Sequence, residues 1–294
     1  EHPEPSPEEL IIDGLAETVE PKETAFFSVI GRELGLTPEE TATLEGRLSE
    51  RPGFLVDLYA EQQYLATHVG ETIPSRQDLT KYQPEIQAWL NDSERSNRES
   101  RIHGPAHFMR VLIDTKLLSC LIEPQLPAKL SELSVKDVPE AYDHMVSTID
   151  HEALAAFAIG HDWARHDDES EDPDHGARAA ESLEDPNVFP DLEDASRILA
   201  QALMTGHSRE DEPTDVALED RVARDADLLD RHRDYEGPDP QFIRLHATAR
   251  IDAVAFTLAV MSDFLIEQKQ EDQVEAVLKT AGALGIVKPE EARR

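Results

Sequence analysis

The stretch that decides the fold is ALAAFAIGHD, residues 153–162. Eight small or apolar residues lead directly into the polar pair His161-Asp162. Alanine and leucine are strong helix formers, and a run that is apolar all round is typical of a buried helix. Burying a polar group without a partner costs roughly 2–7 kcal/mol. We therefore expect His161-Asp162 to be satisfied by a salt bridge, a hydrogen bond or a metal ion.

The helical pattern extends from this stretch toward both ends of the chain. Strong helix formers dominate, glycine is sparse, and apolar residues recur at intervals of three and four. Downstream, the segments expected to be helical are 175–183, 192–207, 215–233, 244–268 and 273–285. Upstream they are 7–19, 24–35, 37–50, 54–69, 78–90 and 104–122, and the stretch itself ends the segment 140–162. No strand-like alternation persists beyond four or five residues, so we predict an all-α fold.

The polar segment LNDSERSNRES, residues 90–100, is the best candidate for a boundary between parts of the chain. We predict an N-terminal helical accessory segment over 1–90 and a main domain over 91–266. A C-terminal helix within 267–294 is expected to pack on that domain. Near the N-terminus, Thr37 followed by Pro38 and Glu40 is the pattern of a helix N-cap with a capping box.

The charge of the chain limits its partners. Its 294 residues include 62 acidic and 28 basic ones, which gives a formal net charge of -34. Such a surface repels phosphate backbones, so duplex nucleic acid is not expected as a partner. Only 8 of the basic residues are lysine. Acid excess with scarce lysine fits a protein that works at high salt, and it fits equally well an ordinary acidic bias.

The compartment is predicted from cysteine use and from the apolar runs. Cys120 is the single cysteine, so no intrachain disulfide forms and a reducing compartment is expected. The longest apolar runs span about ten residues, too few to cross a bilayer. The opening EHPEPSPEEL lacks the basic and apolar regions of a secretion signal. We therefore expect a cytoplasmic protein without a membrane partner.

Several histidines and aspartates lie at predicted helix ends or on apolar helix faces, where side chains from different helices can converge. They are His107, His161, Asp162, His175, His207 and Asp227. Imidazole nitrogens and carboxylate oxygens suit divalent transition metals, and helical bundles build such sites from facing helices. Taken singly, each residue is better explained as a hydrogen-bonded core histidine or a solvated aspartate. Asp225 and Asp230 are expected to be solvated.

The order of these residues resembles the HD-domain superfamily of metal-dependent phosphohydrolases. Its His-x-x-Arg-Val, His-Asp and Ala-Asp-x-Leu motifs are matched by residues 107–111, 161–162 and 226–229. The resemblance extends from about residue 100 to residue 250. It implies an HD-type helical bundle with extra N- and C-terminal helices, in which 91–266 is a metal-binding catalytic domain.

The resemblance also implies roles for individual residues. His107, His161, Asp162 and Asp227 would be ligands of a first metal, and His175 and His207 would complete a binuclear site with Asp162 as the bridge. One or two divalent ions (Mn, Fe, Mg, Co, Ni or Zn) would activate a water for attack on a phosphate ester. Arg165 stands where many relatives have a lysine that contacts the phosphate, and its guanidinium could take that role. Asp162 and Arg165 would be the catalytic residues.

The function that follows is hydrolysis of a small phosphorylated molecule such as a nucleotide. Some HD-fold proteins hold two irons with the same ligand order and oxidise a small polar substrate with dioxygen. A binding or signalling module that retains the site without turnover is a third interpretation. The sequence leaves these three open, and it leaves a homo-oligomer open as well.

Other polar residues near the motifs carry weaker hypotheses. His103, four residues before His107, could contact the site or the substrate, although such a residue more often caps or packs a helix start. Arg110 is expected to pair with a carboxylate of a neighbouring helix, and Trp163 to pack beneath the site. The remaining candidates, for proton transfer, phosphate contact or no role, are His166, Arg178, His232, Arg244 and His246.

Overall fold

The computed structural model describes residues 19–91, 100, 102–123, 149–165, 172–207, 217–234 and 237–288. Within these ranges the secondary structure is helical, and an isolated parallel bridge between Ser75 and Lys288 is the one β-type pairing. The predicted all-α fold is confirmed. Among the described residues, no helix combines the length and apolarity needed to cross a bilayer.

The chain separates into two compact units, the first ending at Val56 and the second starting at Asp57. The first unit contains α2 (Val19–Leu34), α3 (Pro38–Leu48) and the first residues of α4 (Phe54–His68). The Thr37 hydroxyl accepts a hydrogen bond from the Glu40 N–H, and the Glu40 carboxylate accepts one from the Thr37 N–H. The capping box predicted from the sequence is therefore present. The predicted divisions at residues 90 and 266 stay predictions.

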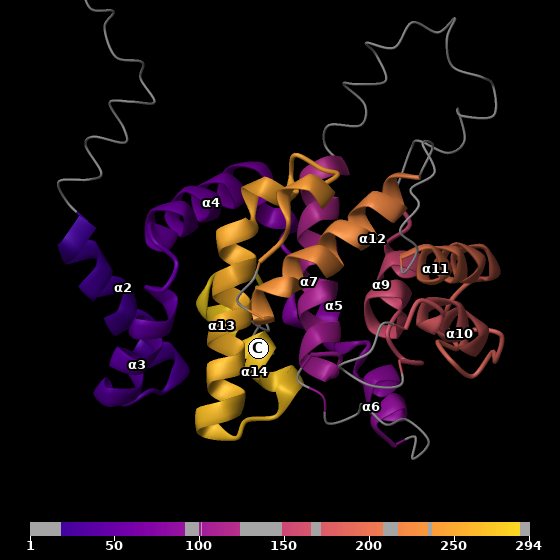
Figure 1. Cartoon of the computed structure of the whole chain (residues 1–294), viewed down its shortest axis with the longest axis horizontal. Helices are drawn as coiled ribbons and strands as arrows, with labels where there is room; N and C mark the ends of the chain where they lie inside the picture. The colour runs from indigo at the N-terminus through magenta and orange to yellow at the C-terminus, as the bar shows by residue number, and fades with distance from the viewer. Residues whose placement is uncertain are drawn as a thin grey trace, which may run out of the picture. The chain divides into compact units, whose positions relative to one another are not determined.

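The second unit is organised around helix α7 (Pro105–Ile122), which is buried along nearly its whole length. The helices that pack most extensively on α7 are α9 (His151–Gly160), α12 (Leu218–Leu229), α13 (Asp252–Lys269) and α14 (Gln273–Ala283), and the short helix α5 (Arg76–Thr80) also contacts it. Figure 1 shows α9 and α12 beside α7, and α13 with α14 on its other flank. The short helix η4 (Asp230–Asp234) follows α12 directly and contacts α7 and α13.

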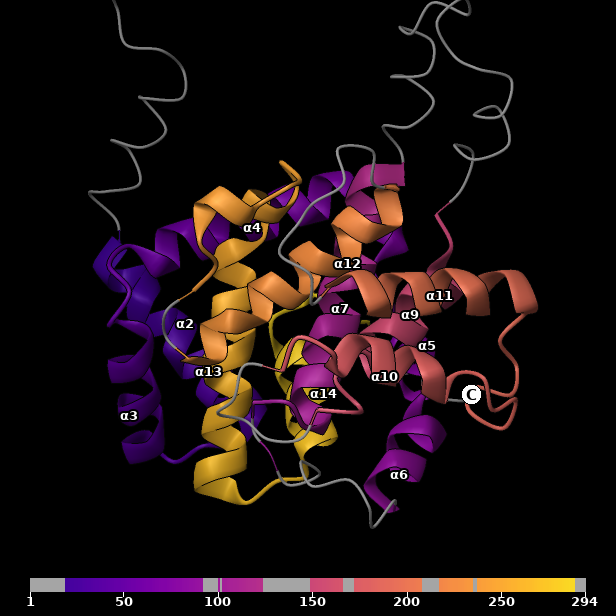
Figure 2. The same ribbon diagram turned by 45° about the vertical axis from the view of Figure 1, so that its right-hand side comes forward.

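A pair of helices, α10 (His175–Ser182) and α11 (Asp194–His207), covers the other side of α9 (Figure 2). The two helices approach each other closely at Gly176. A Cβ atom there would lie 2.1 Å from the Met204 carbonyl oxygen and 2.9 Å from Cε1 of His207. Only a residue without a side chain allows this contact, which brings the ends of α10 and α11 together.

Two segments expected as single helices are interrupted. Residues 78–90 form α5 (Arg76–Thr80) and α6 (Gln83–Asn91), because Pro84 has no N–H to continue a helix and is tolerated only in a first turn. Residues 244–268 form an α-helix only from Asp252 onward, after the short 3-10 helix η6 (Thr248–Arg250). The preceding segment is held outside α13 by Asp225, whose carboxylate accepts hydrogen bonds from the N–H groups of Arg244 and Leu245. The predicted helix 7–19 falls almost wholly outside the described residues, as does 140–148.

Candidate metal centre

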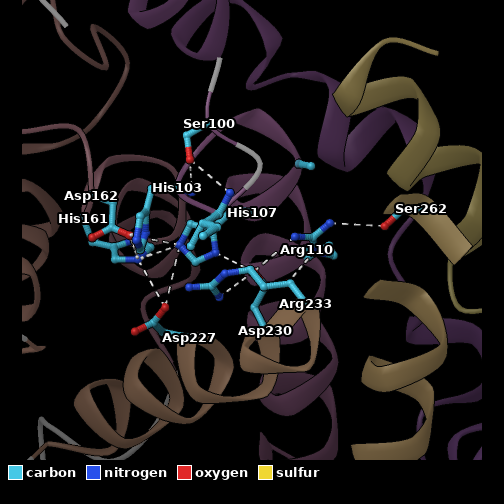
Figure 3. Close-up of polar contacts among 12 residues, drawn as sticks. Ser100, His103, His107, Arg110, His161, Asp162, Asp227, Asp230, Arg233 and Ser262 are labelled. Atoms are coloured by element: carbon cyan, nitrogen blue, oxygen red, sulfur yellow. Dashed lines mark hydrogen bonds and ion pairs between the residues drawn. The ribbon is translucent and has the colours of Figure 1, made fainter. Parts of the chain in front are cut away.

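The six candidate ligands come from five helices and meet in the interior of the second unit. His107 lies on α7, His161-Asp162 follows the last turn of α9, and Asp227 lies in the last turn of α12. His175 begins α10 and His207 ends α11. Figure 3 shows His107, His161, Asp162 and Asp227 converging from three sides. The imidazoles of His107 and His161 are fully buried, and the Asp162 side chain is 4% exposed.

One half of the cluster is built from His107, His161 and Asp227. The Nε2 atoms of the two histidines are 3.1 Å apart. Oδ1 of Asp227 lies 3.7 Å from Nε2 of His107 and 3.5 Å from Nε2 of His161. Oδ2 of Asp162 approaches the same two nitrogens, at 3.3 and 3.5 Å. Four ligand atoms thus surround one small volume.

The other half of the cluster is built from His175 and His207. Their Nε2 atoms are 2.9 Å apart. Oδ1 of Asp162 lies 3.1 Å from Nε2 of His175 and 3.9 Å from Nε2 of His207. Asp162 therefore presents one carboxylate oxygen to each pair of histidines, and it is the only group of the six that serves both halves.

The outer nitrogen of each of the four histidines is engaged by an acceptor. Nδ1 of His161 donates to the Phe157 carbonyl at 3.1 Å, and Nδ1 of His207 donates to the Met204 carbonyl at 2.6 Å. Nδ1 of His175 donates to the Asp172 carbonyl, and Nδ1 of His107 donates to Asp230 at 2.6 Å. Since carbonyl and carboxylate oxygens accept, Nδ1 carries the proton in each ring.

These tautomers leave the Nε2 lone pairs pointing into the cluster. In a neutral imidazole with a proton on Nδ1, Nε2 is an acceptor. Two acceptors that face each other at 2.9 or 3.1 Å repel unless a proton or a metal ion lies between them. Histidines that ligate metals show this same arrangement, with the outer nitrogen held by a carboxylate or carbonyl. The residues present therefore fit a divalent cation.

The pKa values of the cluster follow from the burial of its side chains and from the opposite charges that lie side by side in it. Burial acts to raise the pKa of Asp162, but the charge of His161 and the hydrogen bond from His103 hold it well below its usual range. Burial acts to lower the pKa of His161, and the carboxylates of Asp162 and Asp227 outweigh it and raise the pKa to about 9. Burial lowers the pKa of His207. In the metal-free chain, a proton on His161 thus takes the place of a cation.

The donor set is chemically suited to a transition metal. Three overlapping groups could each hold an ion: His103 with His107 and Asp162, His107 with His161 and Asp227, and His161 with Asp162 and His207. In each group the ligand atoms lie within 4.8 Å of one another. Mixed imidazole and carboxylate ligands are used by Zn, Mn, Fe, Co and Ni. A buried His/Asp cluster that could bind a metal is therefore present, as the sequence predicted.

Arg165, the predicted phosphate contact, lies at the edge of this cluster. It is half-buried, and its N–H donates to the Asp162 carbonyl at 3.1 Å. Burial lowers the pKa of His103, and the charge of Arg165 adds to that effect. The backbone of Arg165 is therefore tied to that of Asp162.

A network of buried charges supports the cluster from behind. Asp230 accepts hydrogen bonds from Arg110, and from Arg233 at 2.9 Å, in addition to His107. Arg110 also donates to Asp263 at 2.8 Å, so the expected pairing of Arg110 with a neighbouring helix is confirmed. The prediction that Asp230 and Asp225 are solvated is wrong: the two residues are 2% and 0% exposed. Each has cationic or N–H partners, which offset the loss of water.

His103 has a closer contact with the cluster than the sequence pattern indicated. Its imidazole is buried, and its Nδ1 lies 2.7 Å from Oδ2 of Asp162. The spacing of four residues to His107 was the available signal, since it places both rings on one helical face. For Asp230, the signal was its place three residues after Asp227. Neither spacing reveals a partner that lies far away in the sequence.

Four of the remaining candidates have structural partners. Trp163 is buried and stacks on Phe189 with 5.5 Å between the rings, as the packing hypothesis expected. Arg178 donates to the Ala164 carbonyl and to Asp172, which ties the loop after Asp162 to α10. The others are Arg244, bound to Asp225; His232, bound to Asp252 at 2.8 Å; and His246, which is exposed. His166 and most of the acidic segment 167–174 lie outside the described residues.

No protein-family model, no curated protein and no solved structure matches this chain.

Proposed function

We propose that this protein is a metal-dependent phosphohydrolase that acts on a small phosphate ester such as a nucleotide. The observation that carries the proposal is the placement of Asp162, with one oxygen toward His107 and His161 and the other toward His175 and His207. This arrangement is suited to two ions that share one carboxylate, and the order of the six residues is that of the HD-domain superfamily. Membership of that superfamily is part of the proposal.

The candidate ligands and Arg165 would have distinct roles in such a site. His107, His161 and Asp227 would hold one ion, and His175 and His207 the other, with Asp162 common to both. A bound divalent pair supplies Lewis acidity toward a phosphoryl oxygen and lowers the pKa of a coordinated water. Arg165, at the edge of the cluster, would bind and orient the phosphate and offset the charge on its oxygens. Burial of the histidines keeps bulk water from competing for the ligand atoms.

The negative surface of the protein has a consequence for such a substrate. A formal net charge of -34 opposes the approach of a phosphorylated molecule over long distances. Salt screens that repulsion, with a Debye length of about 8 Å at physiological ionic strength. We therefore expect substrate capture to improve as ionic strength rises, whereas contacts inside the cluster are little affected.

The test is hydrolysis by the full chain after metal removal and reloading. The protein is loaded in turn with Mn, Mg, Co, Ni, Fe and Zn and is assayed on chromogenic phosphomonoesters and phosphodiesters and on a nucleotide panel. We expect turnover that requires the metal and falls to background in Asp162→Ala. The control is Asp185→Asn, because Asp185 lies on the exposed turn after α10 and caps Asn187 there.

Two other results would replace the proposal. A chain that retains iron, consumes dioxygen and hydrolyses no phosphate ester would be a di-iron oxygenase. A chain that binds a nucleotide tightly, holds its metal and shows no turnover would be a binding or signalling module. Both results are read from the same preparations, by metal analysis, oxygen uptake and calorimetry.

A further inference from the structure

A tight turn before α7 places His103 against the metal cluster. The Ser100 hydroxyl oxygen accepts hydrogen bonds from the N–H groups of Ile102 and His103, at 3.0 and 2.9 Å. At Gly104 a Cβ atom would lie 1.9 Å from the Ser100 carbonyl oxygen. The turn therefore requires glycine, because any side chain would clash with that oxygen. Figure 3 shows the result, with Ser100 above and the His103 ring beside Asp162.

The contact between His103 and Asp162 is the shortest polar contact that Asp162 makes within the cluster. Nδ1 of His103 lies 2.7 Å from Oδ2, whereas the imidazole nitrogens of the four ligand histidines lie 3.1 Å or more from the carboxylate. Both side chains are buried, at 7% and 4% exposure. Since the Asp162 carboxylate accepts, Nδ1 of His103 is the donor, and this bond fixes Oδ2 on the side of His107 and His161.

The orientation of this carboxylate is not fixed by its own torsion preferences. The χ2 angle of aspartate has a broad, roughly two-fold profile, so rotation about it costs little. A rotation would turn Oδ1 away from His175 and His207. Before any ion is bound, the hydrogen bond from His103 is the shortest contact that opposes such a rotation.

We propose that His103 is a positioning residue that holds Asp162 with one oxygen toward each histidine pair, so that binding of the second ion depends on it. The inference rests on the proposed binuclear centre. The first half keeps His107, His161 and Asp227 when Asp162 turns. The second half then keeps only His175 and His207, and two imidazoles hold a divalent ion weakly.

The test is calorimetric titration of Mn²⁺ into the metal-free full chain and three variants at position 103. Asparagine places an amide nitrogen the same number of bonds from Cα as Nδ1, so His103→Asn can still donate to Asp162. His103→Gln displaces the donor by one bond, and His103→Ala removes it. We expect the second ion to bind 10–100-fold more weakly in His103→Ala and His103→Gln, with the first ion unchanged and His103→Asn close to wild type.

A spectroscopic readout separates positioning from packing. Two Mn²⁺ ions bridged by one carboxylate give an exchange-coupled electron paramagnetic resonance signal, and isolated ions do not. We expect the coupled signal in the wild type and in His103→Asn, and its loss in the other two variants. The matched control is His151→Asn, which removes another imidazole–carboxylate contact, His151 to Glu123 at 2.8 Å, at the opposite end of α9 from His161.

The outcomes distinguish this inference from the function it rests on. Two results would overturn the role of His103 without affecting the proposed metal centre of the wild type. One is that every variant binds two ions with wild-type affinity, and the other is that a variant loses the first ion together with the second. Failure of His103→Asn to restore the coupled signal would also overturn it. A wild-type chain that binds no Mn²⁺, Fe²⁺ or Zn²⁺ would overturn the metal centre itself.

Discussion

Nδ1 of His107 lies 2.6 Å from Oδ2 of Asp230, although the two residues are 123 positions apart in the sequence. The contact joins α7 to η4, and both side chains are buried. It fixes the proton of His107 on the outer nitrogen and turns Nε2 toward the cluster. The same carboxylate neutralises the buried guanidinium of Arg110, so one aspartate links the orientation of a ligand to the stability of the core.

Asp230→Asn tests both roles of this carboxylate. The substitution keeps the shape and removes the charge, so Arg110 and Arg233 lose their shared partner in the interior. Removing one member of a buried ion pair costs about 3–5 kcal/mol, and we expect a fall of that order in the free energy of unfolding. Metal affinity should fall about 10–100-fold, because a neutral amide oxygen accepts the Nδ1 proton of His107 less strongly than the carboxylate does. Chemical denaturation and calorimetry measure the two effects.

The control for Asp230 is a more exposed ion pair. Lys279 and Glu271 lie 2.7 Å apart on α14 and the turn before it, with side chains 30% and 25% exposed. Glu271→Gln should cost under about 1 kcal/mol. Equal losses of unfolding free energy in the two variants would show that Asp230 contributes no more to stability than a more exposed ion pair does.

Gly176→Ala tests the close approach of α10 and α11. The added Cβ would meet the Met204 carbonyl and the His207 ring at 2.1 and 2.9 Å. We expect destabilisation of about 1–3 kcal/mol, together with weaker binding of an ion at His175 and His207. In contrast, Gly282→Ala on α14 meets nothing within 4 Å and should stabilise the fold by about 0.5–1 kcal/mol. If Gly176→Ala is as stable as Gly282→Ala, the described packing is wrong.

Metal binding should release a proton from His161. In the metal-free chain the carboxylates of Asp162 and Asp227 overcome burial and raise the pKa of His161 to about 9, so the ring is protonated at pH 7. An ion needs neutral Nε2, and binding therefore releases about one proton at pH 7 and progressively fewer as pH rises through 9. Titrations in buffers of different ionisation enthalpy count that proton. No dependence on the buffer at pH 7 would contradict the assignment.

The same raised pKa sets the pH dependence of the metal-free fold. A group whose pKa is higher in the folded state binds more protons there than in the unfolded chain. The contribution of His161 is therefore complete below about pH 6.5 and is lost as pH rises through about 9. Denaturation of the metal-free chain between these pH values should show this loss, and His161→Gln should abolish it.

Asp114 gives a pH effect of the opposite kind. It is 1% exposed on α7, and its Oδ1 atom has no hydrogen-bond partner among the described residues. Burial, with a further contribution from the charge of Asp230, raises the pKa of Asp114 well above its usual value. The folded chain thus keeps a proton that the unfolded chain loses above about pH 4, and stability falls as pH rises.

Asp114→Asn removes that penalty. We expect the variant to be more stable than the wild type at pH 7, by on the order of 1 kcal/mol, and to differ little below pH 4. Its metal content should be unchanged, because Asp114 is no part of the cluster. Destabilisation at pH 7 would mean that the carboxylate is ionised and paired in the folded chain.

The sequence predicted most of what depends on local pattern. Apolar periodicity identified α7, α9 and α11, and Thr37 with Glu40 identified the start of α3. The six candidate ligands converge because each stands at a helix end or on an apolar face. Pro84 could have been read as a helix start, since proline is favoured in a first turn, and the predicted single helix over 78–90 overlooked it.

What the sequence could not predict depends on long-range pairing. Asp225 and Asp230 look like ordinary helical aspartates until Arg244 and Arg110 are placed beside them. His103 reaches Asp162 across 59 positions, and nothing local distinguishes it from a histidine at a helix start. The start of α13 depends likewise on Asp225, which holds residues 244 and 245 away from a helical path. Buried charge is recognised only when its partner is known.

The measurement that tests the central claim most directly is the number of metal ions per chain. Elemental analysis of purified wild-type protein, of Asp162→Ala and of the Asp114→Asn control requires no knowledge of the substrate. We predict two divalent ions in the wild type and the control, and at most one in Asp162→Ala, because Asp162 contributes an oxygen to each half. No bound metal in the wild type after loading with Mn, Fe or Zn would contradict the claim that the cluster is a metal centre.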